Sequence, residues 1–222
     1  MESQRKVEQE FVDKARQSEK APQGWPAALV MFHLGMWRER LRMGLAELAD
    51  GRPITPPPPI EQQDEINDAE LANGIGTPLS DAAGRSDHLL SEIIELYTKV
   101  GEQPFRWYRA TTTTEAVLGN SYTHPRSHMA AYLRENGEAD RATRIYEDAV
   151  AELRSLPAPA VPMGIVLYNL ACSRALDERR DEALALLEET LALRPDLKPS
   201  IAADEDFATL RDDPKFQEMV KP

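Results

Sequence analysis

Hydrophobic residues recur every three or four positions along most of the chain, the spacing that gathers them on one face of an α-helix. A long helix, the second along the chain, is expected to begin at Pro26 and to end before Gly51, because proline suits a first helical turn and glycine suits a helix end. It carries two neighbouring apolar stripes, which is typical of a helix inside a bundle. A shorter helix is expected before it, with one apolar face formed by Val7, Phe11, Val12 and Ala15.

Two further helices are expected at residues 79–102 and 120–136. Residues 53–84 hold six prolines and six acidic residues but no Lys or Arg, which predicts an extended connection interrupted at most by a short helical turn at 60–73. Residues 105–114 show a weak alternation and are interpreted as a connection. The predicted fold is therefore all-α, with a four-helix bundle that contains one long crossover.

The last third of the chain repeats one pattern, a small residue, a large one four positions later and a small one three positions beyond. This pattern resembles the second helix of a tetratricopeptide repeat. The likeness departs from that family at Glu178, where the turn glycine usually stands, and at Arg174, where an aromatic is usual, whereas Gly137 fits the earlier turn. We expect helical hairpins over 137–222, closed by a capping segment at 204–216. The residues that form the repeated small–large–small pattern are Ala142, Tyr146 and Ala149 in the first unit of the repeat and Ala183, Leu187 and Thr190 in the second.

The acidic composition argues against nucleic acid and anionic membranes as binding partners. The chain has 38 acidic and 26 basic residues and a net charge of −12, the wrong sign for binding nucleic acid or an anionic membrane surface. No apolar run suggests a signal peptide or a membrane span, so a cytoplasmic location is expected. The single cysteine, Cys172, fits a reducing compartment and is expected to be a buried core residue.

Three of the four histidines are candidate metal ligands. His124 and His128 are four residues apart, so their side chains project in the same direction from a helix, and Pro125 places them at its N-terminus. His33 falls between the two apolar stripes of the second helix and faces the interior. Neutral imidazoles suit zinc, nickel, copper or iron. The alternatives are a core histidine bonded to backbone and a solvent-facing helix start, while His88 lies on the polar side of its helix and is expected to be solvated.

The segments "FHLGMW" and "NSYTHPRSHMAAYL" resemble the DinB family of metal-binding four-helix bundles, over about residues 5–136. The resemblance implies a bundle domain at 1–136 and a divalent metal, nickel or zinc, on His33, His124 and His128. It also implies a metal-dependent thiol transferase, isomerase or hydrolase, in which a low-molecular-weight thiol would have to be supplied. The last bundle helix would then also serve as the first helix of the first repeat.

Two residues beside His33 are candidates for a substrate pocket. Trp37 lies one turn beyond His33 and is expected to wall the ion's pocket, although packing is the more usual role of Trp25, Trp37 and Trp107. Arg40 could receive an anionic substrate group, but an ion pair with Glu47 is the favoured interpretation. A different class of function remains open, an interaction protein whose repeats bind a protein or peptide partner. Homodimer formation is also left open.

Overall fold

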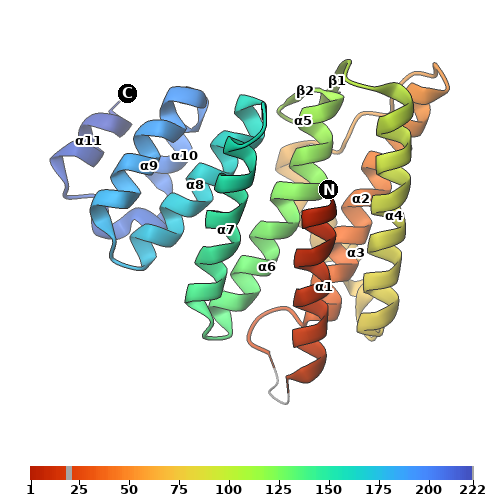
Figure 1. Cartoon of the computed structure of the whole chain (residues 1–222), viewed down its shortest axis with the longest axis horizontal. Helices are drawn as coiled ribbons and strands as arrows, with labels where there is room; N and C mark the ends of the chain where they lie inside the picture. The colour runs from red at the N-terminus through yellow and green to blue at the C-terminus, as the bar shows by residue number, and fades with distance from the viewer. Residues whose placement is uncertain (19–21, 222) are drawn as a thin grey trace. The chain divides into compact units, whose positions relative to one another are not determined.

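The computed structural model describes residues 1–18 and 22–221, which form two compact units, Met1–Asn136 and Gly137–Pro222. Regular structure is almost entirely helical, as predicted (Figure 1). No helix among the described residues is both long and apolar enough to cross a membrane.

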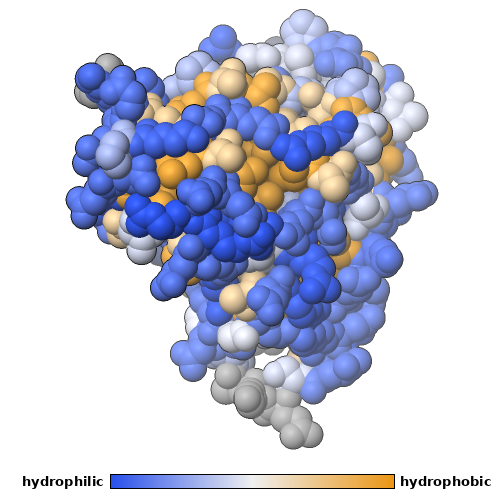
Figure 2. Space-filling view, turned by 60° about the vertical axis from the view of Figure 1, so that its left-hand side comes forward, coloured by the Kyte–Doolittle hydropathy of each residue, from blue (hydrophilic) through white to orange (hydrophobic). Residues whose placement is uncertain are grey.

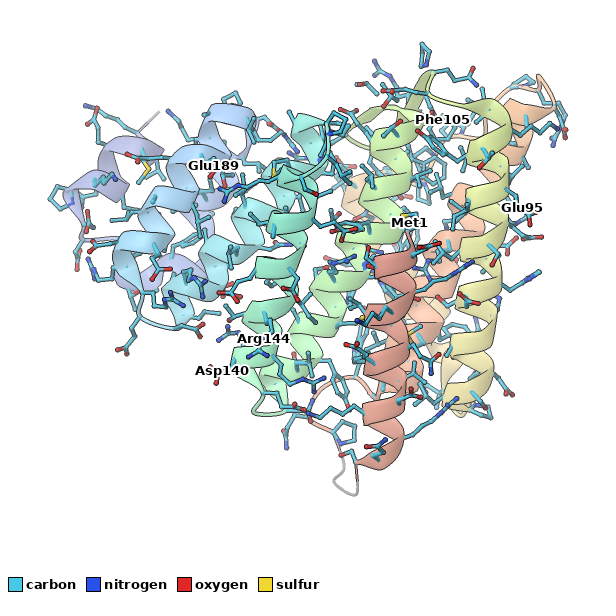
Figure 3. The ribbon with its side chains drawn as sticks, viewed as in Figure 1. Met1, Glu95, Phe105, Asp140, Arg144 and Glu189 are labelled. Carbon is cyan, nitrogen blue, oxygen red and sulfur yellow. The ribbon has the colours of Figure 1, made fainter. Side chains whose placement is uncertain are left out.

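Four helical runs lie side by side in the first unit (Figure 1). They are α1 (Glu2–Gln17), α2 (Ala27–Ala49), α4 (Leu79–Val100) and the run from α5 (Thr113–Leu118) to α6 (His124–Glu135). The expected apolar faces point inward: Leu41 and Leu45 of α2 and Ile93 of α4 are fully buried in one cluster. Acidic residues such as Glu95 line the outer side of α4 (Figure 3).

The connection from α2 to α4 is more ordered than its prolines suggest. Residues 60–74 form a 3₁₀ turn (Ile60–Gln62), α3 (Gln63–Leu71) and a second 3₁₀ turn (Ala72–Gly74). The segment packs on α2, where Asn67 accepts a hydrogen bond from Trp37 and Gly74 lies against the ring of Phe32. The helical turn expected at 60–73 is therefore present, but the segment is packed rather than extended, because it has polar and apolar partners on α2.

Residues 104–112 form a small hairpin rather than a plain connection. Strands β1 (Pro104–Trp107) and β2 (Ala110–Thr112) pair antiparallel, with Trp107 opposite Ala110. The alternation is real, because Phe105 and Trp107 are buried against the α2 core while Arg106 is exposed (Figure 3 labels Phe105). Tyr108, at the turn, has a φ of 51°, a conformation that non-glycine residues rarely adopt.

The α-helix that carries His124 and His128 begins at His124, with Pro125 in its first turn as predicted, but it continues an earlier helical run that was not predicted. A π-helical turn (Gly119–Thr123) joins α5 to α6, and the His124 N–H donates to the Gly119 carbonyl five residues back. In an unbroken α-helix Pro125 would lack one hydrogen bond and clash with the preceding turn. The wider turn absorbs this conflict, so the histidines lie within a helical run that begins at Thr113 and not at a free helix start.

The second unit consists of α7 (Ala139–Arg154), α8 (Ala160–Leu176), α9 (Arg180–Leu193), α10 (Lys198–Ala203) and α11 (Pro214–Val220). α8 packs against both α7 and α9. The segment 204–216 places Phe207, Leu210 and Phe216 in the core of α8 and α9. The residues of the predicted pattern are all buried: Ala142, Tyr146, Ala149, Ala183, Leu187 and Thr190.

Hydrophilic residues predominate over the face drawn in Figure 2, and apolar side chains gather toward its upper part. Among the described residues, the large apolar side chains that remain exposed are Met43, Ile60, Ile75, Leu156, Leu176 and Leu193. Scattered exposure of this kind is normal for a folded protein.

Candidate metal centre

His33, His124 and His128 lie together in the first unit. Each offers one ring nitrogen, and these nitrogens all lie within 4.8 Å of one another. α2 supplies His33 and α6 supplies the other two, so the cluster depends on the packing of two segments about ninety residues apart. His33 is only 1% exposed, while His124 and His128 are partly exposed.

The three rings point their Nε2 atoms at a common centre. His124 Nε2 lies 3.1 Å from His33 Nε2 and 2.9 Å from His128 Nε2. Bonds of about 2.0–2.1 Å to zinc imply separations of roughly 3.3 Å between ligand nitrogens in a tetrahedral site and about 2.9 Å in an octahedral one. The two spacings at His124 Nε2 are compatible with nitrogens that share one ion, and they also lie within hydrogen-bond range.

Hydrogen bonding among the rings accounts poorly for this arrangement. The Asn120 backbone forms a hydrogen bond with His124, and because Nε2 faces the other two rings, Nδ1 makes this bond. His124 Nε2 then carries a single lone pair, which can accept only one N–H although it contacts two nitrogens. A cation at the centre would satisfy all three lone pairs, so the residues fit a metal ion.

The electrostatics keep the rings neutral, the form that binds metals. Burial, followed by His128 and Arg40, lowers the pKa of His33 to about 3. Burial also lowers the pKa of His128 to about 4. The pKa of His124 lies well below its usual value, first through burial and then through the neighbouring histidines and Arg38.

Two tryptophans enclose the cluster. The Trp25 ring stacks on His128 with an angle of 8° between planes and a centroid distance of 5.9 Å, and it meets His33 edge-on. Its loop is tied to the end of α6, because the Gln23 N–H donates to Asn136 Oδ1 at 2.9 Å. Trp37 lies edge-on to His33 at 6.3 Å, on the side where it was expected. Sequence reasoning assigned Trp25 to packing, and no motif marks its contact with His128.

Arg40 lies beside Trp37 but does not pair with Glu47. Its guanidinium carbon is 4.8 Å from the Trp37 ring centroid, and it forms an ion pair with Glu70 of α3. Glu47 instead accepts hydrogen bonds from the backbone and hydroxyl of Thr55. Arg40 and Glu47 are seven residues apart, which is about 10 Å along the helix. The carboxylate of Glu70 on α3 is closer to Arg40 and forms the ion pair instead.

The other candidate residues have structural roles. His88 is exposed beside Glu92, as predicted, and Trp107 is a core residue. Cys172 is buried in the second unit, also as predicted. It lies near Asp204 and Asp206, but Asp204 already caps a 3₁₀ turn and accepts a hydrogen bond from Tyr168.

Helix α2, the π-turn and α6 thus bring three neutral imidazoles to one point between two tryptophans. No protein-family model, curated protein or solved structure matches the chain.

Proposed function

We propose that the protein binds one divalent transition-metal ion through His33, His124 and His128, and that this ion is the centre of its activity. The observation that carries the proposal is the convergence of three Nε2 atoms at 2.9 and 3.1 Å. Nitrogen ligands in a neutral state favour zinc or nickel over magnesium or calcium, which prefer oxygen.

Three protein ligands leave coordination positions for an exchangeable group. A metal held in this way supplies a Lewis acid that lowers the pKa of bound water or of a thiol. We therefore propose a metal-dependent hydrolase or thiol transferase. The only cysteine of the chain, Cys172, lies outside the first unit, so a thiol would come from a low-molecular-weight cofactor.

The residues around the ion would give the site its selectivity. Trp25 and Trp37 supply apolar walls that limit access of water and strengthen electrostatic interactions inside. Arg40 is partly exposed beside Trp37 and close enough to His33 to lower its pKa. We propose that Arg40 positions an anionic group of the substrate, in exchange for part of its interaction with Glu70.

The test is elemental analysis of untagged protein purified without chelators. We expect about one equivalent of zinc or nickel per chain, and its loss in His33→Ala and in the His124→Ala/His128→Ala double variant. His88→Ala is the matched control, since His88 is exposed and lies on another helix, and it should retain the metal. Wild-type protein that stays free of metal after reconstitution with zinc and with nickel would refute the proposal.

A further inference from the structure

His33 lacks the hydrogen bond that normally orients a histidine at a metal site. Its Nε2 faces the other histidines, 3.1 Å from His124 Nε2. Its Nδ1 is buried, and among the described residues no group lies in hydrogen-bonding position to it. A ligating histidine almost always donates its second ring N–H to a carboxylate, a carbonyl or a water, and this bond fixes the orientation of the ring. At His33 another contact must therefore set the plane of the ring.

Trp25 contacts His33 and a second proposed ligand at once. Its ring centroid lies 5.3 Å from that of His33, with 63° between the planes, and 5.9 Å from that of His128, with 8° between the planes. Edge-to-face and offset-stacked arrangements at such separations are the favourable geometries of aromatic rings. The rings of His33 and His128 meet each other at 66° and 4.5 Å. Trp25 thus packs against both rings in the relative tilt with which they aim Nε2 at His124.

The backbone on both sides of Trp25 is fixed. The Gln23 N–H donates to Asn136 Oδ1 at 2.9 Å, and Asn136 Nδ2 donates back to the Gln23 carbonyl at 3.4 Å. Gly24 has a φ of 65° and lies so close to Glu135 that a Cβ would come within 2.2 Å of its carboxylate. Helix α2 begins two residues after Trp25. The indole is therefore held between the end of α6 and the start of α2.

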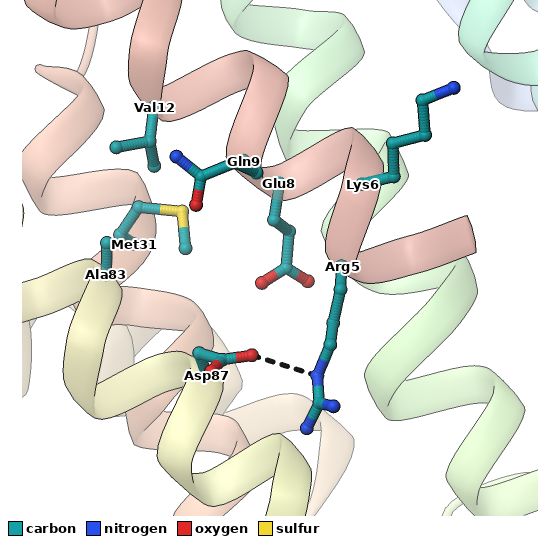
Figure 4. A pocket seen from close by; sticks show the side chains of 8 residues that line it. All are labelled: Arg5, Lys6, Glu8, Gln9, Val12, Met31, Ala83 and Asp87. Carbon is teal, nitrogen blue, oxygen red and sulfur yellow. Dashed lines mark ion pairs between the residues drawn. The ribbon is translucent and has the colours of Figure 1, made fainter. Parts of the chain in front are cut away.

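Neither Trp37 nor the cavity of the first unit provides an equivalent contact. The Trp37 ring meets His33 at the longer distance of 6.3 Å, and its N–H donates to Asn67, so its position follows α3. A cavity of about 340 Å³ lies between α1, α2 and α4, where Figure 4 shows the Arg5–Asp87 ion pair. None of its eight lining residues is a histidine or a tryptophan, so this cavity is separate from the histidine cluster.

We infer that Trp25 is a positioning residue of the metal centre, whose ring sets the planes of His33 and His128 in place of a hydrogen bond to His33. The inference rests on the proposed function. It differs from a purely structural role, in which Trp25 closes the loop before α2 and has no influence on zinc affinity. It also differs from the role of an apolar wall, because a wall requires bulk but not a flat ring.

The experiment separates a flat ring from apolar bulk. Competition with a chromogenic chelator measures the zinc affinity of wild type, Trp25→Leu and Trp25→Phe. We expect Trp25→Leu to bind zinc at least about tenfold more weakly, the usual scale for outer-shell partners of a metal site. Trp25→Phe keeps a ring that can stack on His128 and should stay within about threefold of wild type. Circular dichroism checks that each variant is folded.

A second measurement reports the geometry of the ligands themselves. Co²⁺ bound in place of zinc has a visible absorption spectrum that depends on the arrangement of its ligands. This spectrum should change in Trp25→Leu and be kept in Trp25→Phe. Weaker binding by Trp25→Leu with an unchanged Co²⁺ spectrum would overturn the inference, because the ligand rings would then keep their planes without Trp25.

The matched control is Trp107→Leu, which removes a tryptophan of the same unit whose ring lies against Phe105 and Tyr108. It should lower stability but change zinc affinity less than about threefold, since distant sites act independently. Trp107→Phe takes its place if leucine prevents folding there.

An unchanged zinc affinity in Trp25→Leu, an equal loss in the control, or a folded Trp25→Phe as weak as Trp25→Leu would overturn the inference. If Trp25→Leu does not fold, Trp25→Met, which also lacks a ring, decides in the same way. Wild-type protein that binds no zinc refutes the proposed function itself, whereas histidine-dependent binding that ignores Trp25 refutes only this inference.

Discussion

Glu178 closes the turn between α8 and α9 with a φ of 60°, a left-handed conformation in which a side chain is strained. Gly137 has a φ of 80° at the corresponding turn before α7. We expect Glu178→Gly to raise the free energy of unfolding by about 0.5–1 kcal/mol, because glycine adopts this conformation without strain. Urea unfolding followed by circular dichroism measures the change.

The paired control is Gly137→Ala, which introduces the same strain where glycine avoids it. No atom lies within 4 Å of the added Cβ, so backbone strain alone should lower stability, by about 1 kcal/mol. Opposite signs for the two variants are the expected result. A loss of stability in Glu178→Gly would mean that the Glu178 side chain makes a stabilising contact that outweighs the strain.

The histidine cluster should make metal-free protein sensitive to acid. In the unfolded chain the rings have pKa values of about 6.5, whereas in the folded protein those of His33 and His128 fall to about 3 and about 4. Unfolding therefore takes up protons below pH 6.5. Stability is fully present above that pH and falls toward pH 4, by up to roughly 1.4 kcal/mol per pH unit for each histidine.

Chemical unfolding of chelator-treated protein at pH 7.5, 6.5 and 5.5 measures this slope. The His124→Ala/His128→Ala variant should show a shallower dependence, because two of the groups that take up protons are gone. Identical slopes in the two proteins would show that other residues cause the acid sensitivity.

Cys172 should be unreactive in the native protein. Burial chiefly raises the pKa of its thiol, and the carboxylates of Asp204 and Asp206 raise it further. A thiol-specific reagent at pH 8 should therefore react at least about a hundredfold more slowly with native than with urea-unfolded protein, since each pKa unit reduces the thiolate tenfold. As a control, Ser155→Cys in the Cys172→Ala background places a thiol at an exposed position, where it should react rapidly. If Cys172 in the native protein reacts as fast as this exposed thiol, it is not the buried, unreactive residue described here.

At the scale of single residues, the sequence predicted the three histidines as a group and Trp37 beside His33, but not the other residues around them. Spacing identified His124 and His128 as a pair, and the position of His33 between apolar stripes indicated an inward side chain. The partners of buried side chains are far away in the chain: Glu8 meets Arg38 across thirty residues, and Trp25 reaches His128 through a loop. Helical periodicity says which face is buried but not which residue of another helix it will meet.

At the scale of elements, α3 packs on α2, the helix that carries His33 of the proposed metal centre. A Cβ on Gly74 would lie 2.5 Å from the ring of Phe32, closer than real contacts allow. Gly74→Ala should therefore push α3 away from α2 and lower the free energy of unfolding by about 1–2 kcal/mol. It should also weaken zinc binding modestly, because α3 holds Trp37 and Arg40 through Asn67 and Glu70.

The matched variant is Gly84→Ala, on the exposed face of α4 where nothing lies near an added Cβ. It should raise stability by up to about 1 kcal/mol, since alanine is the better helix former. Equal effects of the two substitutions would indicate that Phe32 moves aside and that α3 is not held in close contact.

The two elements that periodicity missed have separate physical causes. The hairpin over residues 104–112 is too short for alternation to stand out, and tertiary contacts of Phe105 and Trp107 stabilise it. The π-turn before His124 results from the conflict between Pro125 and an α-helix that continues on both sides. Proline normally marks a helix start, so the same residue predicted a boundary where the fold has a widened turn.

At the scale of the whole molecule, the proposed metal centre belongs to the first unit alone. His33, His124, His128 and both enclosing tryptophans lie within Met1–Asn136. A chain that ends after Glu138 keeps Gly137, whose φ of 80° is typical of the residue that ends a helix. We therefore expect this shortened chain to retain one equivalent of zinc, with an affinity within about threefold of the full chain.

Elemental analysis and chelator competition measure the metal content and zinc affinity of the shortened chain and of the isolated segment 137–222. The second segment should bind no metal, since its Cys172 thiol stays protonated and Asp204 already caps a turn. Loss of zinc from a shortened chain that remains helical by circular dichroism would mean that the second unit contributes to the site. Retention of zinc would confine the metal chemistry to the first unit and leave the helical hairpins free for a separate role, such as binding a protein partner.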